Sequence, residues 1–138
     1  MAEFQEFVDA QDAVWTDVLR ELRAGQKTSH WIWWIFPQLR ALGRSPRALH
    51  FGLAGLDEAA AYLSHPTLGP RLQDCTALLL THDGTDPERI LGPVDALKVR
   101  SCMTLFEAVP KAPAAFSTVL DRMYGGARCP VTTRALSP

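Results

Sequence analysis

The feature that most constrains the fold is the helical spacing of the apolar residues, which glycine and proline interrupt at short intervals. Between residues 4 and 22 the large apolar side chains fall on one stripe of a helix, and Gly25 follows where that helix would end. Similar patterns predict further helices over residues 57–65, 71–82, 92–110 and 114–126. No segment shows the alternation of apolar and polar residues that predicts a strand.

Shorter elements are indicated where a capping residue stands before a proline. Ser45 precedes Pro46 and Asp86 precedes Pro87, a pattern typical of a helix start. A chain of 138 residues has room for one hydrophobic core. We therefore expect an all-α protein. It should be a single compact domain of about five to seven helices with short loops over residues 1–126, followed by a loosely ordered C-terminal tail over residues 127–138.

The charge balance argues against a dedicated nucleic-acid-binding protein. The chain has 14 Lys and Arg residues against 15 Asp and Glu residues, a net charge of -1. We therefore expect no extended surface for nucleic acid. Residues 30–55 nevertheless contain Arg40, Arg44 and Arg47 and no acidic residue, so a local phosphate contact stays open.

Cysteine use and hydropathy point to the cytoplasm. Cys75, Cys102 and Cys129 are widely spaced and form no CxxC motif, so neither a disulfide framework nor a metal site is indicated. The sequence shows no secretion signal and no apolar run of roughly 20 residues. We expect a cytoplasmic protein that uses no metal and no cofactor and does not enter a membrane.

The densest aromatic segment is KTSHWIWWIFPQL, residues 27–39. Ser29 is placed to cap a short helix over residues 30–36, which Pro37 would end. Six successive apolar residues cannot all face one core, so some of the tryptophans should be half-exposed, where they would offer flat walls to a base or a ribose. The alternative is that all of them are core and rim residues. The tryptophans concerned are Trp31, Trp33 and Trp34.

Two polar residues adjoin these tryptophans. Lys27 would supply a phosphate contact, and His30 would supply a general acid or base. The alternative for His30 is a purely structural role.

A lysine interrupts the apolar stripe of the helix predicted over residues 92–110. Lys98 falls inside that stripe, and Asp95 lies one turn earlier with the spacing of an ion pair. Burying an ammonium group is costly, so Lys98 needs an explanation. Its role would be structural if it pairs with Asp95 or extends its ammonium group to water. Its role would be functional if it lies in a pocket and either holds an anion or attacks a sugar carbonyl. The residues expected on the inner side are Val94, Leu97, Cys102, Leu105, Phe106 and Val109. Those expected on the outer side are Arg100, Thr104 and Glu107.

Three further polar residues are candidates for ligand binding. Gln11 lies near the centre of the first helix's apolar stripe and should be buried, with structural partners or facing a ligand. His65 is placed to cap the turn between two helices. Arg71 follows one turn into the next helix, where its guanidinium and backbone N–H groups would meet an anion. The common nucleotide, dinucleotide and hydrolase motifs are absent.

Four motifs resemble those of a bacterial family catalogued as domain of unknown function 1810 and sometimes labelled calpastatin-like: FVDAQ, GQKTSHWIWWIFPQL, YLSHPTLGPRL and DALKVRSCMTLF. The resemblance runs from about Phe4 to Gly126 and implies a mainly helical fold. The family pattern has an acidic residue after the final Gly-rich turn, where this chain has Cys129. More distantly, the chain is similar in size, helical character and inward lysine to the NADAR superfamily. That superfamily is associated with NAD and ADP-ribose and includes enzymes that remove ADP-ribose from guanine through a lysine.

Two functions of different classes follow as hypotheses. The first is an enzyme that binds a small-molecule nucleotide or ADP-ribosylated substrate and cleaves an N-glycosidic bond, with Lys98 as nucleophile, Asp95 orienting it and His30 as acid or base. Its ligand-binding residues would be Gln11, Lys27, Trp31, Trp33, Trp34, His65 and Arg71. The second is a non-catalytic module that binds a nucleotide or a protein through the Trp-rich segment. In either case we expect a monomer or a weak homodimer.

Overall fold

The elements of the fold are almost entirely helical. The computed structural model describes residues 1–137. Its elements are α1 (Phe4–Ala24), α2 (Ile32–Ile35), the 3-10 helix η1 (Arg40–Leu42), α3 (Pro46–His50), α4 (Leu56–Ser64), α5 (Leu68–Leu80), α6 (Pro87–Leu91), α7 (Pro93–Glu107), α8 (Ala115–Met123) and α9 (Pro130–Leu136). Within residues 1–137 no strand forms, and the sheet-like pairing is one isolated bridge between Leu39 and Leu53. The all-α class is confirmed.

The expected number of five to seven helices is wrong, because residues 1–137 form nine α-helices. The excess consists mainly of very short helices: α2, α3 and α6 have only four or five residues each. Proline begins α3, α6 and α9, because its fixed backbone angle suits the first helical position. The side chains of Ser45 and Asp86 cap two of these helices, as the sequence predicted.

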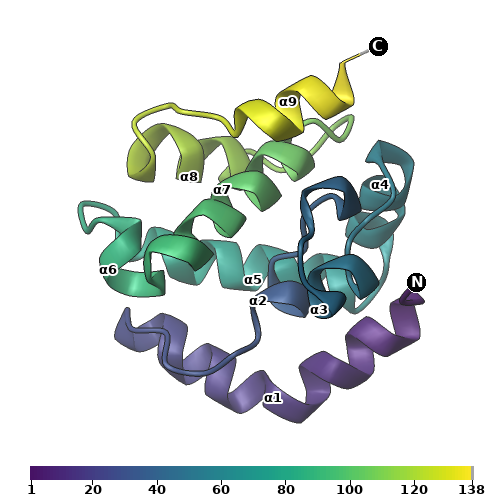
Figure 1. Cartoon of the computed structure of the whole chain (residues 1–138). Coiled ribbons are helices and arrows are strands. Elements are labelled where there is room, and N and C mark those ends of the chain that lie inside the picture. Colours follow the sequence, from purple (N-terminus) through teal and green to yellow (C-terminus); the bar gives the residue numbers. More distant parts are fainter. Residues whose placement is uncertain (138) are drawn as a thin grey trace.

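The first helix is the element that the sequence predicts most closely. α1 ends at Ala24, and Gly25 takes the left-handed conformation with φ +70°, which glycine adopts without strain. The Gly25 N–H then closes the last turn by donating to the carbonyl groups of Glu21 and Leu22. α1 lies along the bottom of the molecule in Figure 1 and packs against α5.

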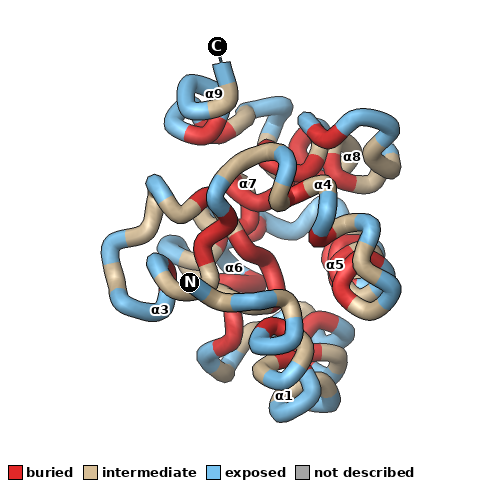
Figure 2. The backbone as a smooth tube through the Cα atoms, turned by 90° about the vertical axis from the view of Figure 1, so that its right-hand side faces the viewer, coloured by how far each residue is buried: buried red, intermediate tan, exposed pale blue. Residues whose placement is uncertain are grey.

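α7 runs through the centre of the fold and contacts α4, α6, α8 and α9. Every residue from 101 to 106 is buried, and Figure 2 shows this buried stretch in the middle of the molecule. The predicted faces of α7 are therefore partly wrong. Val94 and Leu97, expected inside, are 64% and 56% exposed, while Thr104, expected outside, is buried. The second half of α7 is enclosed on all sides and has no outer face. Assigning every residue of the helix to one inner or one outer side therefore gives the wrong burial there.

Residues 130–136 form α9, although a loosely ordered tail was predicted there. The Cys129 backbone N–H donates to Thr104 Oγ1 at 3.0 Å, and the Ser101 hydroxyl lies 3.3 Å from the Cys129 sulfur. These contacts fasten α9 to α7 and bury Thr104. None of the helices in residues 1–137 combines the length and hydropathy that crossing a bilayer requires.

Candidate functional site

The loop between α1 and α2 is held by one buried carboxylate that was not among the residues predicted from the sequence. Glu21 is 3% exposed, and its Oε1 accepts hydrogen bonds from the N–H groups of Thr28 (2.6 Å) and Ser29 (2.7 Å) and from the Trp31 indole (3.2 Å). Burial alone would raise the pKa of Glu21, but these hydrogen bonds outweigh it and lower the pKa. The predicted Ser29 cap is wrong, because α2 begins at Ile32 and its N-cap is Trp31.

The three tryptophans of this segment have different environments. Trp31 is completely buried and belongs to the core. Trp33 and Trp34 are half-buried, with ring centroids 5.7 Å apart, and Trp34 also packs against Phe51 at 5.3 Å. The dense aromatic stretch is therefore both core and surface, and Trp33 and Trp34 are its accessible part.

Two cationic side chains from different helices approach the Trp33 ring. The Arg47 guanidinium carbon, from α3, lies 5.0 Å from the ring centroid, and the Lys98 ammonium, from α7, lies 5.2 Å from it. Both contacts are within the range of cation–π attraction. Arg47 is exposed, and the Lys98 side chain is 24% exposed. Lys98 therefore stands at an accessible edge of the molecule and is not sealed in the core.

Asp95 lies between two lysines. Its carboxylate is 2.7 Å from the Lys27 ammonium and 3.8 Å from the Lys98 ammonium, so the predicted Asp95–Lys98 pair forms at long range. The Lys27 side chain is only 6% exposed, donates to the Ser29 carbonyl at 2.5 Å and lies 4.7 Å from the Trp31 ring centroid. Lys27 is thus the buried lysine and is committed to protein contacts. Trp33, Arg47, Asp95 and Lys98 are called the tryptophan–cation cluster below.

Gln11 is buried, as the sequence predicted, but it belongs to a separate group of contacts. Its Nε2 donates to the Trp34 carbonyl at 2.7 Å and to the Tyr62 hydroxyl at 3.1 Å, and its Oε1 accepts from Arg71 at 3.3 Å. Arg71 also pairs with Asp12 at 2.7 Å. These contacts give Gln11 and Arg71 structural partners, and none of them joins the pair to the tryptophan–cation cluster.

Neither of the two predicted histidines makes a hydrogen bond or ion pair to the cluster within residues 1–137. His65 Nδ1 accepts hydrogen bonds from the backbone N–H groups of Thr67 and Leu68, so it caps the start of α5, the role that the sequence suggested. His30 is exposed and makes no hydrogen bond or ion pair to any residue among 1–137. His30 therefore has no partner there that would orient it as an acid or base.

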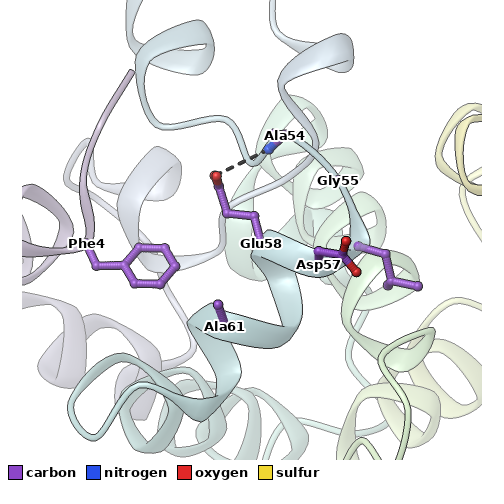
Figure 3. Close-up of a pocket in the computed structure, with 7 residues that line it drawn as sticks. Phe4, Ala54, Gly55, Asp57, Glu58 and Ala61 are labelled. Atoms are coloured by element: carbon purple, nitrogen blue, oxygen red, sulfur yellow. Dashed lines mark hydrogen bonds between the residues drawn. The ribbon is translucent and has the colours of Figure 1, made fainter.

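Cavities lie elsewhere on the molecule. Neither the tryptophan–cation cluster nor Gln11 lines any of the five best-defined cavities within residues 1–137. The largest, about 690 Å³, lies between the start of α1 and the start of α4. Figure 3 shows the Phe4 ring at its side and Glu58 turned back to accept the Ala54 N–H at 3.3 Å. The tryptophan–cation cluster thus lies outside these five cavities, with Trp33 and Lys98 partly exposed.

The cluster carries an excess of positive charge. Among residues 1–137, Asp95 is the one carboxylate within 4 Å of Lys98, and it is shared with Lys27, while Arg47 has no ion pair. An anion that reaches these cations would offset the excess charge. Among the same residues no group of three or more His, Cys, Asp or Glu is placed to hold a metal ion. The chemistry that this geometry offers is anion binding beside an aromatic surface.

The comparisons with known proteins identify a family without an assigned reaction. The chain is similar to the conserved hypothetical protein Rv1873 from Mycobacterium tuberculosis, whose crystal structure it matches with a TM-score of 0.93 and 47% sequence identity, covering 96% of this chain and 94% of that chain. No curated protein matches the chain. The model of the family described as protein of unknown function (DUF1810) matches residues 1–136, and the chain therefore belongs to the DUF1810 family.

Proposed function

We propose that the tryptophan–cation cluster binds a small, anionic, nucleotide-like molecule, with its negative group between Arg47 and Lys98. The observation that carries this proposal is the approach of two cationic side chains, from α3 and α7, to one accessible tryptophan ring. The neighbouring carboxylate, Asp95, is already 2.7 Å from Lys27. A phosphate would therefore neutralise charge that the described protein groups leave uncompensated.

The aromatic surface favours a nucleotide over a bare phosphate. Trp33 and Trp34 are both half-buried, with their planes inclined at 39°. Stacking a base on such a ring contributes about 1–3 kcal/mol. Arg47 is exposed and can turn from the ring toward a phosphate while its place over the ring is taken by a base.

A lysine-dependent N-glycosidase acting on an ADP-ribose-like substrate is the second candidate. The Asp95 carboxylate, 3.8 Å from the Lys98 amine, favours it because the carboxylate would orient the nucleophile. The amine would form a bond to the sugar C1 as the bond from C1 to the base breaks and the base leaves with a proton. After ring opening, water would hydrolyse the resulting imine. The open surface around Lys98 makes this chemistry the less favoured reading, because an imine intermediate requires protection from water.

The proposed binding is tested by thermal unfolding of the wild type in the presence of ADP-ribose, NAD, ADP and inorganic pyrophosphate. A nucleotide at 100 times its dissociation constant should stabilise the folded protein by about 2.7 kcal/mol. Lys98→Met and Arg47→Met should each abolish most of this stabilisation. Arg44→Met is the matched control, because Arg44 is exposed in the same segment and makes no ion pair among residues 1–137.

The outcomes separate the two candidates. Stabilisation by nucleotides but not by pyrophosphate, lost in both cluster variants and kept in the control, would support binding through the ring and the cations. Borohydride treatment with an ADP-ribosylated substrate should leave Lys98 unmodified if the site only binds, whereas an adduct on Lys98 would establish the enzyme. If no nucleotide stabilises the wild type, the binding proposal is wrong.

A further inference from the structure

A second cavity lies between α6, the first half of α7 and the end of α8. It has a volume of about 340 Å³, at the small end of the range for ligand pockets. Most of its wall is apolar, and the apolar residues concerned are Pro87, Pro93, Ala96, Leu97 and Met123. Its polar residues are Asp86, Glu88, Arg100 and Tyr124. The cavity therefore combines an apolar wall with one cation and two carboxylates.

The guanidinium of Arg100 has no partner among residues 1–137. It makes no hydrogen bond or ion pair there, and its Nε is buried without an acceptor. The Nη groups of Arg100 are not enclosed in this way and also lack a partner among residues 1–137, so a ligand carboxylate would pair with both of them through two parallel hydrogen bonds. Arg100 is therefore a ready anchor for a ligand carboxylate inside this cavity.

The two acidic residues at the same cavity are separated from Arg100. Neither Asp86 nor Glu88 forms an ion pair with Arg100, so their carboxylate oxygens lie more than 4 Å from its nitrogens. Asp86 is partly engaged, because its Oδ1 accepts the backbone N–H of Glu88 at 2.8 Å. The Glu88 side chain is exposed and has no partner among residues 1–137. A ligand with both a negative and a positive group would pair with Arg100 through the first and with Glu88 through the second.

The hydroxyl of Tyr124 provides another contact in the cavity. It donates to the Ala96 carbonyl at 2.7 Å, which leaves its oxygen free to accept a hydrogen bond from a ligand. Burial raises the pKa of Tyr124, so the hydroxyl stays neutral at physiological pH.

We propose that this cavity binds an apolar α-amino acid in its zwitterionic form. The ligand carboxylate pairs with Arg100, its ammonium group faces Glu88 and the Tyr124 oxygen, and its side chain packs against Leu97 and Met123. A simple anion would meet repulsion from Asp86 and Glu88, and a simple cation would meet repulsion from Arg100. The zwitterion matches both charges and the apolar wall.

The experiment is a titration of the full-length protein with L-leucine, followed by isothermal calorimetry and by amide chemical shifts. Two analogues test the charges: 4-methylpentanoate lacks the ammonium group, and 3-methylbutylamine lacks the carboxylate. We expect saturable leucine binding and at least tenfold weaker binding of each analogue. Arg100→Met should weaken leucine binding at least tenfold, and Glu88→Gln should remove the preference for leucine over 4-methylpentanoate.

Two control variants make the test specific. Arg89→Met changes an exposed arginine of α6 that does not line the cavity, and Lys98→Met changes the tryptophan–cation cluster, so both should bind leucine like the wild type. The proposal is overturned if leucine does not bind, if 4-methylpentanoate binds as tightly as leucine, or if Arg100→Met leaves leucine binding unchanged. Should Arg100→Met fail to fold, the analogue series on the wild type decides alone.

Discussion

The Lys27 ammonium lies 2.7 Å from the Asp95 carboxylate, and this pair joins the loop after α1 to the first turn of α7. The Lys27 side chain is 6% exposed and the Asp95 side chain 19% exposed, so the two charged groups are largely removed from water. Lys98, which the helical pattern singled out, is the more accessible of the two lysines beside Asp95. The close ion pair and the accessible ammonium thus belong to two different lysines.

Replacing Lys27 should cost much more stability than replacing Lys98. Lys27→Met removes the near partner of a largely buried carboxylate, which typically costs about 3 kcal/mol. Lys98→Met should change the free energy of unfolding by less than about 1 kcal/mol, because Asp95 keeps its 2.7 Å partner. Urea unfolding of the two variants measures both values.

The double variant Lys27→Met/Asp95→Asn is the control for this assignment. It removes both charges, so it should recover part of the stability that Lys27→Met loses. Equal losses for Lys27→Met and Lys98→Met would show that the division of roles is wrong.

Gln11 should be a strong determinant of stability. Gln11→Ala removes a buried side chain and leaves the Trp34 carbonyl and the Tyr62 hydroxyl without their donor, which should cost about 2–4 kcal/mol. The matched control is Gln5→Ala, because Gln5 is exposed on the same helix and bonds only to Asp9 among residues 1–137. The control should change the free energy of unfolding by less than about 0.5 kcal/mol. A cost below about 1 kcal/mol for Gln11→Ala would contradict the role given to its hydrogen bonds.

Local backbone chemistry explains which parts of the fold could be predicted. The Gly25 stop and the Ser45–Pro46 and Asp86–Pro87 starts act within one turn of helix, and all three occur in the structure. The burial of Gln11 follows equally from the position of one residue on one helix. Such features need no knowledge of neighbouring elements.

Features that depend on packing between distant segments could not be predicted from the residues of a single helix. Thr104 is buried because α9 packs against the second half of α7, whereas Val94 and Leu97 lie in the first half and stay exposed. The pattern of apolar residues contains no strong helical signal for α9. The role of Glu21 depends on a loop that folds back onto α1. The sequence does contain one sign of this role. Glu21 lies in the last turn of α1, where a negative charge is unfavourable beside the helix dipole, so its presence suggests a specific partner.

The buried Glu21 carboxylate should make stability depend on acid pH. Its pKa in the folded state is lowered from the ordinary value of 4.5, so the charged group stabilises the fold above that value. This stabilisation is lost as the pH falls through the folded pKa. The difference in free energy of unfolding between wild type and Glu21→Gln should therefore be largest at neutral pH and shrink toward pH 3. Asp74→Asn, at an exposed aspartate of α5, is the control and should show a small difference throughout.

The start of α9 is a position where a substitution should stabilise the protein. Cys129 occupies the N-cap of α9, where its sulfur is only a weak acceptor for the N–H groups of Val131 and Thr132 and for the buried Thr132 hydroxyl. An aspartate at this position would accept hydrogen bonds from the first turn and from Thr132, so Cys129→Asp should raise the free energy of unfolding by about 1 kcal/mol. Cys129→Asn supplies a capping oxygen without a charge, so it separates the effect of the hydrogen bonds from that of the charge. Cys129→Ala supplies neither and should not stabilise the protein. The prediction fails if, in thermal unfolding, Cys129→Asp is no more stable than Cys129→Ala, because the charge would then cost more in this buried position than the cap contributes.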